Sequence, residues 1–168
     1  MDVLFNIGIE NIIMITSAAV FLLLLIFAVD WRYFRDWVVV YLFKAVLDLT
    51  LGSAVVEAGL LSYPVRLLPG SFDTSIIFEI WIFPILCILY NQITRTRSLW
   101  PIVYYALLFG AGITIMEYSL EIYTDLIKYV SWKWYYSFLS LTVLFLASRL
   151  FIAFYRWGCR RFSHNYMY

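Results

Sequence analysis

The chain has 168 residues, of which 64% are hydrophobic, 21% are aromatic and 14% are charged. Soluble domains are about half apolar and about a quarter charged, so this chain has too few polar residues to cover itself in water and we expect its solvent to be lipid. The formal net charge of +1 gives no reason to expect a nucleic acid or a strongly acidic partner.

Five apolar segments are long enough to cross a bilayer, which takes about 20 mainly apolar residues. The predicted spans are about residues 7–29, 38–61, 75–93, 102–126 and 134–155. The first contains the hydrocarbon run MITSAAVFLLLLIFAV, and the third carries Pro84 near its centre, which predicts a kink. We therefore predict one all-α domain over residues 1–168, an integral membrane bundle of five transmembrane helices.

Basic residues between the predicted spans indicate how the chain is threaded, because cytoplasmic segments are enriched in Lys and Arg. The segments after the first, third and fifth spans carry Arg32, Arg35, Arg95, Arg97, Arg156, Arg160 and Arg161. The segments after the second and fourth spans carry Arg66, Lys128 and Lys133 beside Asp73 and Asp125. This pattern predicts an outside N-terminus and a cytoplasmic C-terminus.

The second span contains two charges in the run VYLFKAVLDLTLG. Lys44 and Asp48 are one helical turn apart and share a face, so they can form an ion pair. A lone charge near the bilayer centre costs about 2.5–3.5 kcal/mol on insertion scales, and pairing lowers that cost. We expect both side chains to face the interior of the bundle.

The other spans carry charges as well. Glu79 lies in the third span and Arg149 in the fifth. In the fourth, a polar stripe at helical spacing runs along Gly110, Thr114, Glu117, Glu121 and Lys128. The candidate binding or coupling residues are therefore Lys44, Asp48, Glu79, Thr114, Glu117, Glu121 and Arg149.

Two interpretations of these charges remain open. In the first, the charged residues line an acidic vestibule that is closed on its cytoplasmic side by Lys44 and Arg149. The vestibule would attract a cation or a basic headgroup, or Asp48 or Glu117 would carry a proton. In the second, they are polar contacts that hold helices together, with Arg149 docked on Asp48. Small residues in FGAGIT and LGSA favour close helix packing in either case.

A weak internal repeat relates the second half of the chain to the first. Shifted by 66 residues, Leu60, Tyr63, Ser71 and Phe72 fall on Leu126, Tyr129, Ser137 and Phe138, and Arg95 falls on Arg161. This pattern predicts one helix followed by two copies of a helical hairpin, arranged as a parallel repeat. In transporters built from repeats, the binding site lies between the repeats.

Motifs for known chemistry are not found. With two scattered cysteines, Cys87 and Cys159, and the single His164, we expect neither a disulfide nor a zinc site. The sequence has no phosphate-binding glycine loop, no GxSxG and no HExxH, so we predict no cofactor and no catalytic residues, and an enzyme acting on lipid is the least supported class.

The leading hypothesis is a small transporter-like or ion/proton-coupled membrane protein. The alternative is a non-catalytic accessory or lipid-binding subunit that associates with another membrane protein or with a second copy of itself.

The segment EIYTDLIKYVSWKWYYSF, residues 121–138, together with the Arg149-bearing span that follows, resembles an uncharacterised family of small multi-span membrane proteins of spore-forming Firmicutes. The resemblance covers about the last third of the chain, and it extends to the remainder only in architecture. It implies a multi-pass protein of a bacterial plasma membrane. It supplies no activity and no functional residues.

Overall fold

The computed structural model describes residues 8–66 and 73–162. Within these residues, five helical segments are long and apolar enough to cross a membrane, which confirms the predicted fold class. The helices are α1 (Ile9–Phe27), α2 (Phe34–Glu57), α3 (Phe83–Thr94), α4 (Leu99–Tyr123) and α5 (Trp134–Phe162). Helices suit apolar sequences of this length because lipid offers no hydrogen bonds, so each backbone amide must be satisfied within its own segment.

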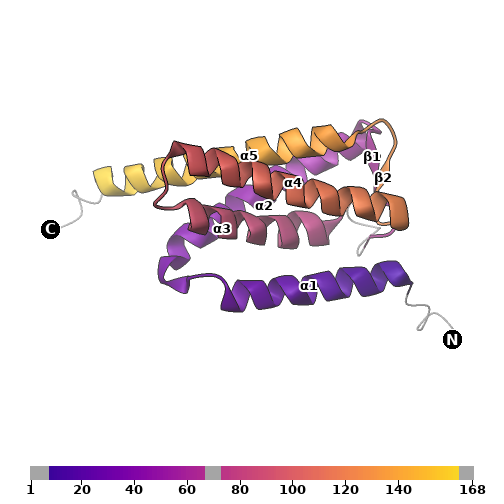
Figure 1. The fold of residues 1–168 in the computed structure, drawn as a ribbon, viewed down its shortest axis with the longest axis horizontal. Helices are drawn as coiled ribbons and strands as arrows, with labels where there is room; N and C mark the ends of the chain where they lie inside the picture. Colours follow the sequence, from indigo (N-terminus) through magenta and orange to yellow (C-terminus); the bar gives the residue numbers. More distant parts are fainter. Residues whose placement is uncertain (1–7, 67–72, 163–168) are drawn as a thin grey trace.

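Helices α2 to α5 form a bundle, and α1 lies along one side of it (Figure 1). The closest helix pairs are α4 with α5 and α2 with α3. Aromatic rings from three helices meet in the core: the centroid of Phe145 lies 5.1 Å from that of Tyr90 and 5.6 Å from that of Phe109. In contrast, Met14 is the one buried residue of α1, so this helix is mainly a lipid-facing element.

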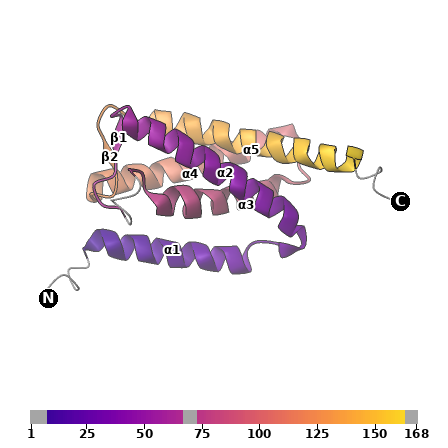
Figure 2. The ribbon, with the colours of Figure 1, turned by 180° about the vertical axis from the view of Figure 1, so that it is seen from behind.

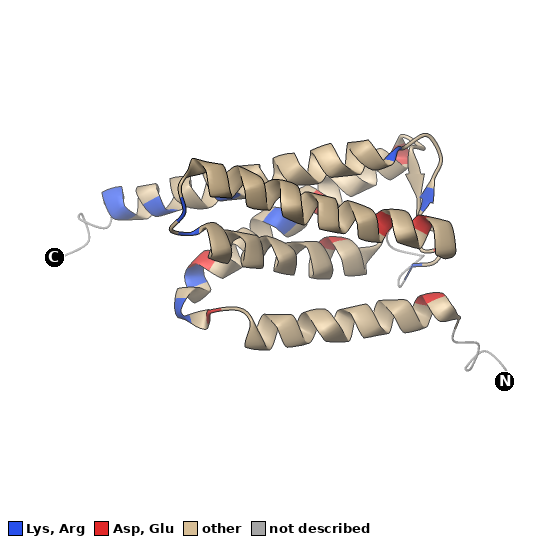
Figure 3. Cartoon of the chain, in the orientation of Figure 1, with Lys and Arg blue, Asp and Glu red and all other residues tan. Residues whose placement is uncertain are grey.

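Most charged residues lie toward the two ends of the bundle, and a few, such as Lys44 and Asp48, are buried inside it (Figure 3). We call the end with the α1–α2 and α3–α4 connections the basic end, because Arg32, Arg35, Arg95, Arg97, Arg156 and Arg160 lie there. At the opposite end, β1 (Leu61–Ser62) pairs antiparallel with β2 (Lys128–Tyr129), and we call it the strand end.

The two hairpins, α2–β1–α3 and α4–β2–α5, match at the predicted offset of 66 residues. Helices α2 and α4 end at Glu57 and Tyr123, which are equivalent positions. In the strand pair, Ser62 lies opposite Lys128, which is the residue that the 66-residue offset makes equivalent to it. The antiparallel pairing of equivalent residues is the arrangement that an approximate two-fold axis requires, and both hairpins run in the same direction, as a parallel repeat predicts.

Helices α2 and α4 end earlier than predicted, and each end has a local cause. After α2, Gly59 adopts a positive φ of 68°, and the amides of Gly59 and Leu60 donate to the carbonyls of Val56 and Val55. This is the Schellman arrangement that closes a helix. After α4, Thr124 is extended, and its hydroxyl donates back to the carbonyl of Leu120.

The end of α4 corrects one prediction. Lys128 does not continue the polar stripe of the fourth span, because it lies in β2 beyond the end of the helix. There its ammonium pairs with Asp125 at 3.0 Å. Helix α5 is longer than predicted. It continues to Phe162 and includes the arginines that were expected to follow the fifth span.

The third span begins with a π-helical turn, Ile77–Ile82, directly before Pro84. Because proline has no N–H, the carbonyl of Ile80 lacks the donor that an α-helix would supply four residues later. The hydroxyl of Tyr41 on α2 donates to that carbonyl at 2.6 Å. The sequence predicts a kink at Pro84, and the structure has a π-helical turn before it, whose free carbonyl is satisfied from a neighbouring helix.

Replacing Tyr41 with phenylalanine should remove this donor and lower the free energy of unfolding by about 0.5–1.5 kcal/mol. Thermal unfolding in detergent would measure the change. Tyr104→Phe is the matched control, because Tyr104 is an exposed tyrosine on α4 and its variant should unfold as wild type does. Equal stability of the two variants would show that the Ile80 carbonyl does not depend on Tyr41.

Glycines allow close approach at two places, as predicted for the small-residue segments. A Cβ atom at Gly110 of α4 would lie 2.6 Å from Thr142 Oγ1 of α5. A Cβ atom at Gly52 of α2 would overlap with Glu79 Oε1. The first contact brings α4 and α5 together, and the second makes room for a carboxylate inside the bundle.

Candidate functional site

A cavity of about 230 Å³ opens in the half of the bundle nearer the strand end. It is enclosed by both hairpins, since its walls come from α2, the π-helical turn, α3, α4 and α5, with β1 above. Its polar lining is Asp48, Tyr63, Glu79, Glu117, Trp132, Ser137 and Ser140. Its apolar lining includes Leu51, Val55, Leu61, Phe83, Leu141 and Leu144.

Three carboxylates from three different segments face this cavity. Asp48 of α2 is 6% exposed and Glu79 of the π-helical turn is 3% exposed, while Glu117 of α4 is partly buried. The carboxyl of Glu79 occupies the space that Gly52 leaves beside α2. Within the described part of the chain, Asp48 Oδ2 and Glu79 Oε2 are buried and accept no hydrogen bond. Buried acceptors of this kind favour a donor or a cation as ligand.

Lys44 lies beneath the cavity on the side of the basic end. Its side chain is 0% exposed, and its ammonium forms the predicted ion pair with Asp48. The ammonium also lies 5.6 Å from the ring centroid of Phe83 and 5.8 Å from that of Phe145, within the range of cation–π attraction. Lys44 therefore offsets the charge of Asp48 and leaves Glu79 and Glu117 as the uncompensated acids of the cavity wall.

Aromatic side chains from the connections between helices cover the cavity at the strand end. The indole of Trp132 donates to Ser137 Oγ at 2.9 Å, and the hydroxyl of Tyr129 lies 3.5 Å from the same oxygen. Tyr63 is buried beside them. These contacts place hydrogen-bonding groups between the carboxylates and the outside of the bundle.

Both phenols at this cover are held in their neutral form. Burial raises the pKa of Tyr63 well above its usual range, and the charges of Glu117 and Glu79 raise it further. Burial also raises the pKa of Tyr129 to about 12. Each therefore keeps its proton at neutral pH and can donate it to a hydrogen bond.

The remaining predicted site residues lie outside this cavity. Thr114 is buried in α4 and donates to the carbonyl of Gly110 at 2.8 Å. Glu121 lies one turn beyond Glu117, near the end of α4. Arg149 does not dock on Asp48: its guanidinium donates to the carbonyl of Arg95 at 2.9 Å, at the basic end. Arg149 closes the end of α3, because the last carbonyls of a helix have no partner within it.

A second polar cluster, not anticipated from the sequence, lies toward the basic end. The amide of Asn91 donates to Ser148 Oγ and to the carbonyl of Cys87, each at 2.9 Å, and all three residues are buried. This cluster joins α3 to α5. The signal in the sequence was the single Asn within an apolar run, which is costly in lipid unless a neighbouring helix supplies a partner.

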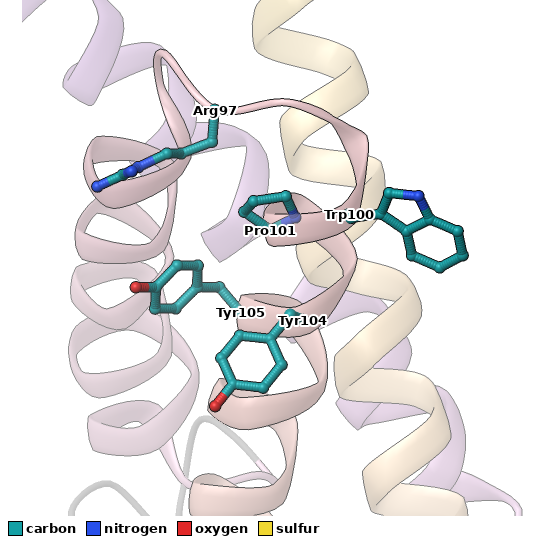
Figure 4. Close-up of a pocket in the computed structure, with 5 residues that line it drawn as sticks. All are labelled: Arg97, Trp100, Pro101, Tyr104 and Tyr105. Carbon is teal, nitrogen blue, oxygen red and sulfur yellow. The ribbon is translucent and has the colours of Figure 1, made fainter.

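A hollow at the basic end is of a different kind. Arg97, Trp100, Pro101, Tyr104 and Tyr105 line it, with a volume of about 420 Å³ (Figure 4). Trp100 is 85% exposed and points away from the two tyrosines. An open hollow rich in exposed aromatic rings at a helix end is typical of interfacial anchoring, so we do not assign it as the site.

Metal ligation has no cluster to support it: no group of three or more His, Cys, Asp or Glu side chains in residues 8–66 and 73–162 is placed to hold a metal ion. The carboxylates of Asp48, Glu79 and Glu117 line one cavity but do not form such a group. Comparisons of this chain with known protein families, with curated proteins and with solved structures found no match.

Proposed function

We propose that this membrane protein binds a small organic cation in the cavity between its two hairpins and acts as a transporter-like or ion/proton-coupled protein. The observation that carries the proposal is the convergence of Asp48, Glu79 and Glu117, from three separate segments, on one partly enclosed cavity. Intramembrane carboxylates are costly, and they are found where ions or substrates bind.

The charge and the walls of the cavity suggest the class of ligand. With Lys44 compensating Asp48, the remaining acids Glu79 and Glu117 favour a positively charged group. Apolar side chains such as Leu51 and Leu141 complete the wall, as in small-molecule sites that combine an apolar surface with a few polar groups. An alkylammonium ion, with its charge at the carboxylates and its chain on the apolar wall, fits both features.

The position of the cavity supports a role in transport. Sites between repeated units are typical of transporters, in which the units move against each other. In the threading that the arginine-rich segments favour, the cavity lies in the outer half of the bundle, beneath its aromatic cover, and the family that the chain resembles implies a bacterial plasma membrane. Lys44 and the apolar core then close the route toward the cytoplasm.

Titration of the purified protein with n-butylammonium, followed by isothermal calorimetry, tests the proposal. The double variant Glu79→Gln/Glu117→Gln should lower the affinity at least about tenfold, because each lost charge–charge contact is worth about 1 kcal/mol or more at such a site. The amides keep the shape of the side chains, so the fold should persist.

The matched control is Glu57→Gln/Glu121→Gln. It removes the same charge from the same end of the bundle, yet neither residue lines the cavity, so affinity should stay within about twofold of wild type. An absence of saturable binding to wild type, or an equal loss in both double variants, would reject the cavity as a cation site.

A further inference from the structure

A separate cavity of about 340 Å³ lies at the basic end, between α2, α3 and α5. Its lining is Arg35, Asp36, Arg95, Tyr155, Arg156, Cys159 and Arg160. It therefore brings together four guanidinium groups and one carboxylate. These residues come from three segments that are far apart in the sequence, and the proposed cation site uses none of them.

Two of the four arginines are fixed by contacts with the protein. Arg156 forms two contacts with Asp36 Oδ2, at 2.7 Å from Nη2 and at 2.9 Å from Nε. The guanidinium of Arg95 lies 3.2 Å from the ring centroid of Tyr33, which orients it by cation–π stacking. The single carboxylate is thus compensated, and the cavity has a rigid positively charged wall.

The other two arginines complete the cavity from α2 and α5. Arg35 and Arg160 are exposed, and neither forms an ion pair with a carboxylate in the described part of the chain. The planar donor fork of arginine suits phosphate oxygens. We propose that this cavity binds the phosphate headgroup of an anionic phospholipid, with Arg35 and Arg160 gripping the phosphate against the wall formed by Arg95 and Arg156.

The level of the cavity favours a lipid as the source of the phosphate. Helix α5 has 29 residues and is about 43 Å long at about 1.5 Å per residue, which exceeds the roughly 30 Å of a hydrocarbon core. Its arginine-bearing end projects beyond the other helices (Figure 2). The cavity at the base of this projection lies where headgroups meet the apolar core.

Exposed apolar surfaces that could contact acyl chains begin next to Arg35 and Arg160. On α2, Val38, Leu42 and Val46 are exposed and follow Arg35 at helical spacing on one face. On α5, Trp157 and Leu150 are exposed and precede Arg160 on one face. A diacyl lipid would occupy the charged cavity and these faces together, whereas a free phosphate ion would use only the cavity.

Native mass spectrometry of the full chain, equilibrated with phosphatidylglycerol and phosphatidylcholine in equal amounts, tests the assignment. Wild type should retain one phosphatidylglycerol in preference to phosphatidylcholine. Arg35→Gln/Arg160→Gln should lower that retention about thirtyfold, the factor that two basic residues contribute near an anionic headgroup. Thermal unfolding of each variant reports whether the fold is kept.

The charge-matched control is Arg32→Gln/Arg97→Gln, which removes two arginines that lie at the same end but do not line this cavity. This control variant should retain phosphatidylglycerol as wild type does. Equal losses in the two variants would overturn the proposal, because they would show a diffuse electrostatic effect. Unchanged retention in Arg35→Gln/Arg160→Gln would also overturn the proposal. Displacement of the lipid by millimolar inorganic phosphate would overturn it too, because that result would identify a site for the free anion.

Discussion

Replacing Asp48 with asparagine should lower the free energy of unfolding by about 3–5 kcal/mol, the cost of breaking a buried ion pair by removing one partner. Lys44 is 0% exposed, and its charged partner is Asp48. The two rings beside its ammonium attract it too weakly to replace a carboxylate. The side chain also cannot reach water without displacing the core around Phe83 and Phe145.

A comparison with two further variants distinguishes an unpaired charge from a lost contact. Lys44→Met should destabilise to a similar extent, because it leaves Asp48 buried without its cation. The double variant Lys44→Met/Asp48→Leu should regain most of the stability, since apolar replacements of a buried ion pair are often neutral or stabilising. Equilibrium unfolding in mixed micelles measures all four proteins. If Asp48→Asn unfolds as wild type does, the pair has no structural role.

Replacing Gly110 with alanine should lower the free energy of unfolding by about 1–3 kcal/mol, the usual cost of overpacking. The new methyl would lie 2.6 Å from Thr142 Oγ1, and that hydroxyl is itself held by the carbonyl of Phe138 at 2.7 Å. The two helices would have to separate. Because Glu117 of α4 and Ser137 and Ser140 of α5 line the same cavity, cation affinity should fall as well.

Gly112, two residues further along α4, provides the matched control. A Cβ atom there meets nothing within 4 Å. Gly112→Ala should therefore raise stability by about 0.5–1 kcal/mol through helix propensity alone. The double variant Gly110→Ala/Thr142→Ala should recover most of the loss, because it removes the atom that the methyl strikes. Thermal unfolding of the three variants checks this, and equal effects at Gly110 and Gly112 would contradict the close approach of α4 and α5.

Local features of the site could be predicted from the sequence. The Lys44–Asp48 pair follows from a spacing of four residues on a helix, and the five spans follow from apolar length. The irregularity at Pro84 follows from a missing amide. Each of these depends on residues close together in the chain, so helical geometry alone fixes the outcome.

Contacts between helices were less predictable. In lipid, most faces of a span are apolar, so hydrophobic periodicity does not say how a helix is rotated about its axis. That rotation decided whether Arg149 met Asp48 or the carbonyl of Arg95. It also placed Glu79 against Gly52. The cavity lining further includes Tyr63, which the sequence places only in the repeat, and Trp132.

The register of the strand pair makes the two hairpins equivalent halves of the bundle. Because Ser62 lies opposite its own equivalent Lys128, a single hairpin could associate with a copy of itself through the same two strands. Within one chain, the two hairpins can carry different residues at matching positions. Lys44 and Asp48 of one copy correspond to Gly110 and Thr114 of the other, and all four are buried. The first hairpin thus places charge at these two positions and the second places small residues, so the two equivalent halves enclose one asymmetric acidic cavity.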